Sequence, residues 1–434
     1  MLPDLSNSSF SVDGLVREDR VHRRVYEDPT IFDLEMERIF GRAWVYVGHE
    51  SQIPKPGDYM TTFIGKSPVI FCRHSDGKAY VLHNRCGHRG ALVCNVERGN
   101  TGRVFMCPYH GWTFQTNGDL HGVPAPDCYT ARYDLNAPEF GLVRVERVGS
   151  HKGFTFASLS RHGAAFALPN LMRKSIDTIT ERAPDGEIEV TGGVHRYAFR
   201  GNWKAQLENS LDHYHAPFSH ASTRGSDSRQ FQRRAGEASG TRLLDEQGGL
   251  TNWDKAEAVG YADGSGYVGP MPGANAERNG PLFDLYKAAL LKTRSAGDVS
   301  RILGDEWYHN AAFYPNMAIQ LRALYIRVIR PMAVDHTEVR VYPIRLKGAP
   351  DEMFHQQIKF LNLTHAAGSL IQTDDLEMFR RIQVGLRGSG TDWVVFGRGY
   401  GMETPKDGGL LAPGTSEVAQ RAQYRAWKHY MSLE

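Results

Sequence analysis

The sequence predicts an α+β protein in which a small all-β domain is inserted into a larger domain, and three observations indicate this. At 434 residues the chain is longer than one hydrophobic core usually supports. Between residues 43 and 157, short β-branched and aromatic runs alternate with Gly, Asp and Asn turns, as in domains of many short strands. Helix-like and strand-like segments are mixed afterwards. We therefore expect a β domain at 43–157 and a larger domain at 158–434.

The individual elements follow from hydrophobic periodicity. Residues 30–40 place Phe32, Met36, Ile39 and Phe40 on one helical face, so the segment 1–42 is predicted to be helical and to pack against the larger domain. In the β domain we expect strands at 59–64, 69–73, 79–82 and 104–106. In the larger domain we expect helices at 204–215, 376–384 and 417–430, and strands at 317–330 and 337–346.

The bulk composition excludes several classes of partner. A formal net charge of +2 gives no electrostatic reason to expect nucleic acid. No apolar run is long enough for a membrane span, and the first residues lack the features of a secretion signal. Five cysteines, an odd number, make a poor disulfide framework. We expect a cytoplasmic protein with neither a nucleic-acid nor a membrane partner.

Two Cys–His pairs stand in predicted loops of the β domain: Cys86 with His88, and Cys107 with His110. Thiolates and imidazoles bind zinc as well as iron–sulfur clusters, so a structural zinc site is the alternative. The spacing C-x-H followed by C-P-x-H-G-W favours a Rieske [2Fe–2S] cluster, in which two cysteines hold one iron and two histidines the other. The role of such a cluster is to accept an electron and pass it on.

A second cluster of candidate ligands lies at residues 208–220. Asn209, Asp212 and His215 share one face of the predicted helix, and Pro217 ends that helix before His220. Two histidines and a carboxylate on one side of an iron leave positions open for oxygen and substrate. The alternative is that the two histidines only pack or form hydrogen bonds. A Rieske site upstream favours iron.

The residues alone leave the third ligand open among Asp212, Asp374 and Asp375. Asp212 suits a supporting role, in which a carboxylate fixes the orientation of a ligand imidazole. Asp374 and Asp375 begin a predicted helix, where an aspartate is commonly only a cap.

Taken together, the two candidate metal-binding segments resemble those of a known protein family. The chain resembles, over nearly its whole length, the α subunits of Rieske non-haem iron aromatic-ring-hydroxylating dioxygenases, and within them the benzoate, toluate and anthranilate branch. The matching segments are 86–90, 107–112, 201–204, 208–220 and 373–375, with a softer match at 326–331, 335–339 and 374–380.

The resemblance implies roles for particular residues. It assigns iron binding to His215, His220 and Asp375. It makes Asp212, with Asn209 beside it, part of the catalytic machinery, and Asp212 would join His215 to His110 of a neighbouring subunit. It also implies an antiparallel sheet covered by helices, of the helix-grip or START-like kind, in the catalytic domain. The expected cofactors are the [2Fe–2S] cluster, a mononuclear Fe(II) and O2 as co-substrate.

The resemblance also implies partners and a reaction. The partners are a small β subunit, in an α3β3 assembly with an α3 core, and a reductase that delivers electrons from NADH. The reaction is cis-dihydroxylation of an aromatic substrate, with benzoate-like acids as the leading class. Aromatic amines, indole-type acids, larger aromatics and monooxygenation remain alternatives. Candidate pocket residues, by position, are Ser210, Leu211, His213, Ala216, Gln320 and Arg322. Arg322 is the candidate for reading a carboxylate.

Overall fold

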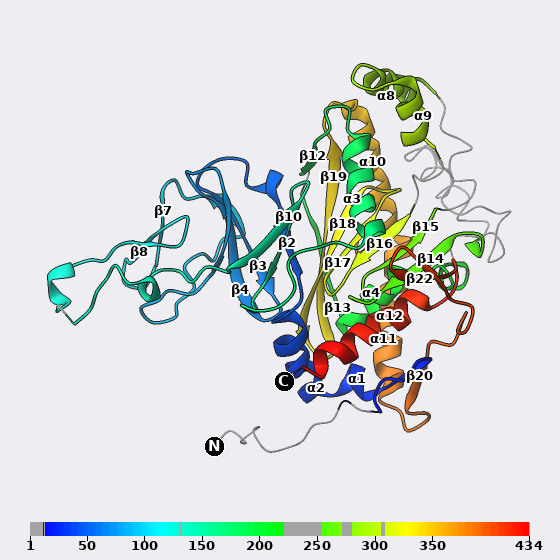
Figure 1. Cartoon of the computed structure of the whole chain (residues 1–434), viewed down its shortest axis with the longest axis horizontal. Helices are drawn as coiled ribbons and strands as arrows, with labels where there is room; N and C mark the ends of the chain where they lie inside the picture. Colours follow the sequence, from blue (N-terminus) through cyan, green and yellow to red (C-terminus); the bar gives the residue numbers. More distant parts are fainter. Residues whose placement is uncertain are drawn as a thin grey trace.

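The computed structural model in Figure 1 has a group of small sheets at one end and a large sheet with helices at the other. It describes residues 12, 14–130, 132–191, 193–220, 253–270, 280–304 and 309–433. The predicted α+β architecture is confirmed, because the large sheet is antiparallel and lies beside helices. In the described part of the chain, no helix is both long and apolar enough to cross a membrane.

The N-terminal segment is helical and packs against the larger domain. Its anchor is Glu35, which is fully buried and accepts hydrogen bonds from Trp203 Nε1 at 2.8 Å, Lys204 Nζ at 2.6 Å and Trp427 Nε1 at 2.6 Å. A buried carboxylate is tolerated when it is paired and fully hydrogen-bonded, as here. The elements are β1 (Arg20–His22), α1 (Arg24–Glu27), α2 (Pro29–Glu35) and a π-helical turn (Met36–Phe40). All four predicted apolar residues, Phe32, Met36, Ile39 and Phe40, are buried.

The β domain contains the strands that the sequence predicts. Its main sheet has the order β5-β4-β3-β6, and a smaller sheet β7-β8-β9 carries the second cysteine loop. The turns between strands use glycine where φ is positive, for example Gly77 with φ +81°. The strands are β2 (Val45–His49), β3 (Asp58–Ile64), β4 (Ser67–Arg73), β5 (Ala79–His83), β6 (Arg98–Asn100), β7 (Val104–Met106), β8 (Thr113–Gln115), β9 (Leu120–Gly122), β10 (Arg147–His151) and β11 (Phe154–Ser158).

The larger domain is built on an antiparallel sheet of order β12-β19-β18-β17-β16-β15-β14-β22-β21, with β13 also paired to β19. Alternate residues of β19 face opposite sides: Val339 and Val341 pack with Phe360 and Phe379 of the covering helices. The strands are β12 (Ile188–Val190), β13 (His195–Phe199), β14 (Glu257–Tyr261), β15 (Gly266–Gly269), β16 (Asn310–Phe313), β17 (Met317–Gln320), β18 (Tyr325–Ala333), β19 (His336–Leu346), β20 (Trp393–Val395), β21 (Thr404–Lys406) and β22 (Gly409–Pro413). The helices are α3 (Asn170–Arg182), α4 (Trp203–Asn209), α5 (Ala216–Ser219), α8 (Pro281–Leu291), α9 (Ala296–Ile302), α10 (Asp351–Thr364), α11 (Leu370–Leu386) and α12 (Val418–Met431).

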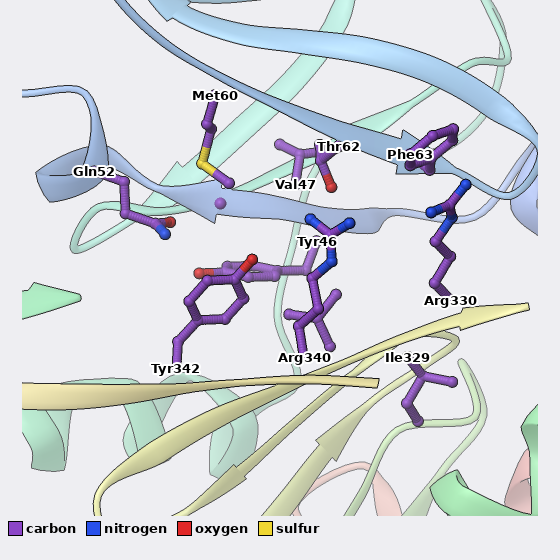
Figure 2. A pocket seen from close by; sticks show the side chains of 12 residues that line it. Tyr46, Val47, Gln52, Met60, Thr62, Phe63, Ile329, Arg330, Arg340 and Tyr342 are labelled. Carbon is purple, nitrogen blue, oxygen red and sulfur yellow. The ribbon is translucent and has the colours of Figure 1, made fainter. Parts of the chain in front are cut away.

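The other face of the large sheet meets the β domain. Figure 2 shows the pocket at this junction, where Tyr342 and Arg340 of β19 point toward Tyr46 of β2. Tyr46 and Asn316 exchange two hydrogen bonds, from Tyr46 N–H to Asn316 Oδ1 at 2.9 Å and from Asn316 Nδ2 to Tyr46 O at 3.0 Å. The Arg330 guanidinium lies 3.3 Å from the centre of the Phe63 ring. These contacts join the two domains.

Two predicted elements are shorter than expected. The helix predicted at 204–215 ends at Asn209, because the Asp212 side chain accepts the backbone N–H groups of Tyr214 and His215 and closes a turn instead. The strand predicted at 317–330 is interrupted after Gln320 by a turn that contains Leu324 with φ +49°. Both corrections move candidate side chains out of the regular positions that the periodicity gave them.

Candidate metal centres and active site

The two cysteine loops of the β domain have the same backbone construction. In each, the cysteine N–H donates to the carbonyl five residues later, and the cysteine carbonyl accepts from a glycine four residues later. The two glycines, Gly90 and Gly111, have φ +74° and +69°, a conformation that favours glycine. The bonds are Cys86 to Ala91 (2.8 Å), Gly90 to Cys86 (2.9 Å), Cys107 to Trp112 (2.8 Å) and Gly111 to Cys107 (3.1 Å).

The two loops place the two cysteine thiols next to each other and the two histidine rings next to each other. The thiols of Cys86 and Cys107 lie within hydrogen-bonding reach of each other, and the rings of His88 and His110 have centroids 4.6 Å apart. Trp112 stacks on His88 at 5.0 Å with an interplanar angle of 3°. Nδ1 of His88 is buried and has no protein partner in the described residues. A thiolate pair beside an imidazole pair fits a cluster with two irons.

The electrostatics of Cys86 also suit a cluster. Burial raises the pKa of its thiol, while backbone N–H groups of His88 and Arg89 stabilise the thiolate form. Such N–H groups stabilise cluster sulfurs in the same way. The chain therefore supplies the donors that a [2Fe–2S] group needs at this place.

The second site joins residues from α4, α5 and α11. Nε2 of His215 and Nε2 of His220 each lie 3.5 Å from Oδ1 of Asp375. One ligand atom from each of the three residues lies within 4.8 Å of the others, and it is the one such metal-ligand group among the described residues. Asn209 donates from Nδ2 to Asp375 Oδ1 at 3.2 Å. Two imidazoles and one carboxylate in this arrangement fit an Fe(II) with open positions.

A carboxylate stands behind each imidazole. Asp212 Oδ2 lies 3.3 Å from Nδ1 of His215, and Asp374 Oδ2 lies 3.3 Å from Nδ1 of His220. The His220 contact is a hydrogen bond that can hold the proton on Nδ1 and leave Nε2 free to bind a metal. Asp212 lies close to Nδ1 of His215, but among the described residues that atom has no hydrogen bond of good geometry. Thus the three aspartates that the sequence left open have separate positions: Asp375 lies between the rings, and the other two lie behind them.

The site favours positive charge. Burial alone would lower the pKa of His215, but the carboxylates of Asp212 and Asp375 raise it to about 10. Burial would raise the pKa of Asp375, but the adjacent His215 and His220, with the cation of Arg327, hold it below the usual value. Because the carboxylates stabilise a cation between them, the donor set fits a divalent metal ion.

Local sequence explains why these residues meet. Asn202 caps α4 by accepting Lys204 N–H at 3.2 Å, and Ser369 caps α11 by accepting Gln372 N–H at 3.2 Å. Because a serine caps α11, Asp375 lies inside the helix with its side chain directed to the site. Pro217 stands in the first turn of α5, where its missing N–H costs nothing, and His220 follows that helix.

The predicted pocket residues occupy different surroundings. Leu211 packs in the main hydrophobic core, and Arg322 lies over the Phe360 ring at 5.7 Å. Ser210 is buried at the end of α4, where its hydroxyl donates to Gln206 O at 2.8 Å. The remaining three are Ala216 at the start of α5, Gln320 at the end of β17 and His213, which is 8% exposed.

Residues that sequence reasoning did not single out complete the surroundings of Asp375. The buried Arg327 donates to Gln372 Oε1 at 2.9 Å and to Ser210 Oγ at 3.4 Å. Burial beside Arg327 lowers the pKa of His365 to about 3, so this ring is neutral. Gln372 precedes Asp375 by three residues, a helical spacing that could have indicated it; nothing in the sequence pattern indicated His365.

Comparison with known proteins decides the family. Residues 43–140 match the Rieske [2Fe-2S] domain, and residues 187–432 match the catalytic domain of the ring hydroxylating alpha subunit. The chain belongs to the ring-hydroxylating alpha-subunit family. It is therefore an oxidoreductase of the aromatic-ring-hydroxylating dioxygenases, whose large subunits use a [2Fe–2S] cluster, a mononuclear iron and O2, with electrons supplied through a reductase.

Individual relatives agree with this assignment. Toluate 1,2-dioxygenase subunit alpha of Pseudomonas putida is 32% identical, over 97% of this chain and 94% of the relative. Anthranilate 1,2-dioxygenase large subunit of Acinetobacter baylyi is 31% identical, over 88% and 80%. The crystal structure of naphthalene 1,2-dioxygenase from Rhodococcus sp. bound to indole superposes with a TM-score of 0.76 at 27% identity, over 95% of this chain and 94% of that one.

Proposed function

We propose that this chain is the large subunit of a cytoplasmic enzyme that cis-dihydroxylates a benzoate-like aromatic acid. The observation that carries the proposal is the convergence of His215, His220 and Asp375 in a chain that also holds the cysteine and histidine pairs of a Rieske domain. The ring-carboxylate class rests on the similarity to subunits named for toluate and anthranilate.

Each metal group has a set of residues that would hold it. Cys86, Cys107, His88 and His110 would hold the cluster in the segment 43–157. His215, His220 and Asp375 would hold the iron in the segment 158–434. A bound iron of this type supplies oxygen activation next to the substrate. The protein's part is to keep the two imidazoles and the carboxylate fixed, which Asp212, Asp374 and Asn209 do through the contacts described above.

We infer that the working unit contains several copies of this chain. In Figure 1 the cluster loop between β7 and β8 lies at one end of the molecule, far from α4 and α11 in the other half. A group on the cluster loop of a neighbouring copy would come closer to Asp212, whose side chain is 32% exposed. The proposed link runs from Asp212 to His110 of that neighbour, whose ring is partly exposed.

Exposed apolar side chains support this arrangement on both sides. Met106 at the end of β7 and Tyr109 in the cluster loop are 64% and 60% exposed. Beside Asp212, Phe218 is 61% exposed, and Tyr214 lies under the Arg398 guanidinium at 4.3 Å. Exposed apolar residues gathered near functional groups are typical of interaction surfaces. We attribute these exposed side chains to contacts between copies of this chain in an α3 core. The full proposed assembly is α3β3, with a small β subunit, and an NADH-dependent reductase supplies its electrons.

The test is product analysis with isotopically labelled oxygen. The purified enzyme with its reductase and NADH receives benzoate, toluate or anthranilate under ¹⁸O2, and the product mass is measured. Two labelled atoms in one ring product support the proposal. One labelled atom identifies a monooxygenase, and oxygenation only of an amine, an indole-type acid or a hydrocarbon rejects the substrate class. NADH consumption without product counts against the proposal, because it shows uncoupled oxygen reduction.

A further inference from the structure

A buried histidine beside the iron ligands has an unused hydrogen-bonding atom. His213 is 8% exposed and stands two residues before His215. Its Nε2 lies 3.4 Å from Nδ2 of Asn310 in β16. Its Nδ1 is buried and has no hydrogen-bond partner among the described residues. A buried polar atom without a partner costs free energy, and a ligand that accepted a hydrogen bond from it would recover that free energy.

The side-chain amide of Asn310 indicates which ring nitrogen of His213 carries the proton. Asn310 Nδ2 also lies 3.2 Å from the backbone carbonyl of Ser210, which can only accept a hydrogen bond. The NH2 group of Asn310 must therefore face Ser210, and the same group then donates to Nε2 of His213. An imidazole that accepts at Nε2 carries its proton on Nδ1. The free atom of His213, Nδ1, is thus an N–H donor.

His213 lies in the segment that links α4 to the proposed iron ligand His215. Ser210 and His213 bracket the turn between α4 and the iron ligand His215. On the sheet side, Asn310 of β16 pairs with Gln320 of β17, so two amide side chains stand opposite each other. Gln320 Oε1 is taken by Ala323 N–H at 2.6 Å. The remaining unsatisfied atoms of this group are His213 Nδ1 and Asn310 Oδ1.

We propose that His213 donates its Nδ1–H to the carboxylate of the aromatic substrate, and that Asn310 is the positioning residue that keeps the proton on Nδ1. This inference rests on the proposed function and deepens it. It replaces Arg322 with His213 as the residue that reads the carboxylate. A hydrogen bond from His213 to a charged acceptor would favour a carboxylate over an uncharged group of the same shape.

The test compares benzoate with nitrobenzene, which has the same shape and no charge. Calorimetry measures the Kd of each compound for the metal-loaded enzyme, either wild type or with His213→Leu. We expect the variant to bind benzoate about 10- to 100-fold more weakly, while nitrobenzene binding changes by less than about threefold. His213→Gln, which retains a donor, should recover part of the loss. Asn310→Ala should lower the preference for benzoate in the same direction but less.

Controls separate this inference from folding defects and from the proposed function. His355→Leu, at a site whose side chain is 65% exposed, should leave both Kd values unchanged. Iron content and cluster absorption must match wild type in every variant. Equal loss for both ligands, unchanged benzoate binding in His213→Leu, or no benzoate binding by wild type would each overturn the inference. Failure of the proposed function is seen separately, as the absence of doubly labelled product.

Discussion

The two candidate metal sites are built in opposite ways. The cluster residues come from two short loops that close on themselves through backbone hydrogen bonds, and the four ligands lie within 25 residues of sequence, from Cys86 to His110. The iron site depends on tertiary packing, because Asn209 and Asp375, which bond to each other, are 166 residues apart. One site is a local structure of the chain; the other exists only when α4, α5 and α11 are assembled.

The difference extends to their surroundings. In both sites the sulfur or carboxylate residues are buried, since Cys86 and Cys107 are 3% and 2% exposed and Asp375 is 6% exposed. The cluster loops differ in that exposed side chains such as Tyr109 border them. A local site with an exposed border suits exchange of electrons with partners. A buried site excludes water and strengthens the interactions of its charged groups with one another. We therefore expect substitutions at the iron site to leave the cluster intact.

Asp375→Ala should have the largest effect. The carboxylate completes the ligand set, so its loss should remove the mononuclear iron and lower activity at least about 1,000-fold. The visible absorption of the cluster should remain, because its loops do not depend on α11. Metal analysis and the absorption spectrum measure both outcomes. Asp351→Ala on the exposed start of α10 is the matched control; full iron content in Asp375→Ala would show that the ligand lies elsewhere.

Asp212→Ala should come next. It removes the group proposed to join the iron site of one copy to the cluster of another, so turnover should fall about 100-fold even with both metals loaded. The measurement is the rate at which the reduced cluster is reoxidised when substrate and O2 are added. If that rate stays normal, electrons do not pass between the two sites through Asp212.

Local features of the chain were predictable from the sequence, whereas features that depend on tertiary packing were not. The four residues proposed to hold the cluster were selected by spacing, because a closed loop of a few residues is a local feature. The short strands at 59–64, 69–73, 79–82 and 104–106 were likewise confirmed, since alternation and turn residues are local signals. His215 and His220 were selected for the same reason, and the structure brings them together with Asp375.

The remainder depended on tertiary contacts. The choice among Asp212, Asp374 and Asp375 needed the family resemblance, because helix periodicity cannot tell which carboxylate of α11 meets α4. The helix predicted through His215 was wrong beyond Asn209, since a side-chain hydrogen bond of Asp212 outcompetes the helical pattern. Asn310 was missed because it reaches the site through sheet pairing.

Asp374→Asn should have an intermediate effect. Its carboxylate lies behind Nδ1 of His220, and loss of such a partner usually weakens metal binding about 10- to 100-fold. The measurement is iron loss to a competing chelator at increasing concentrations, and substrate oxygenation should recover when excess Fe(II) is supplied. A variant that keeps iron as firmly as wild type would mean that helix packing alone orients His220.

The smallest effect concerns the junction where β2 joins the two regions. Burial lowers the pKa of His49 to about 4, and the neutral ring accepts Ser51 N–H at 3.1 Å and contacts Lys152 O at 3.0 Å. The folded-state pKa is below the unfolded value near 6.5. The contribution of His49 to stability is therefore present above pH 6.5 and is lost as the pH falls toward 4, by at most about 3 kcal/mol.

His49→Gln isolates this contribution. The variant should be less stable than wild type at pH 7, and its melting temperature should fall less between pH 6.5 and 4. Thermal unfolding followed at the cluster absorption and by far-ultraviolet circular dichroism measures both regions in one sample. If protonation of His49 weakens the junction, the two signals should separate at acidic pH in wild type but not in the variant. Parallel pH profiles for the two proteins would show that protonation of His49 does not govern the junction, and that the cluster domain and the iron domain respond to acid through other groups.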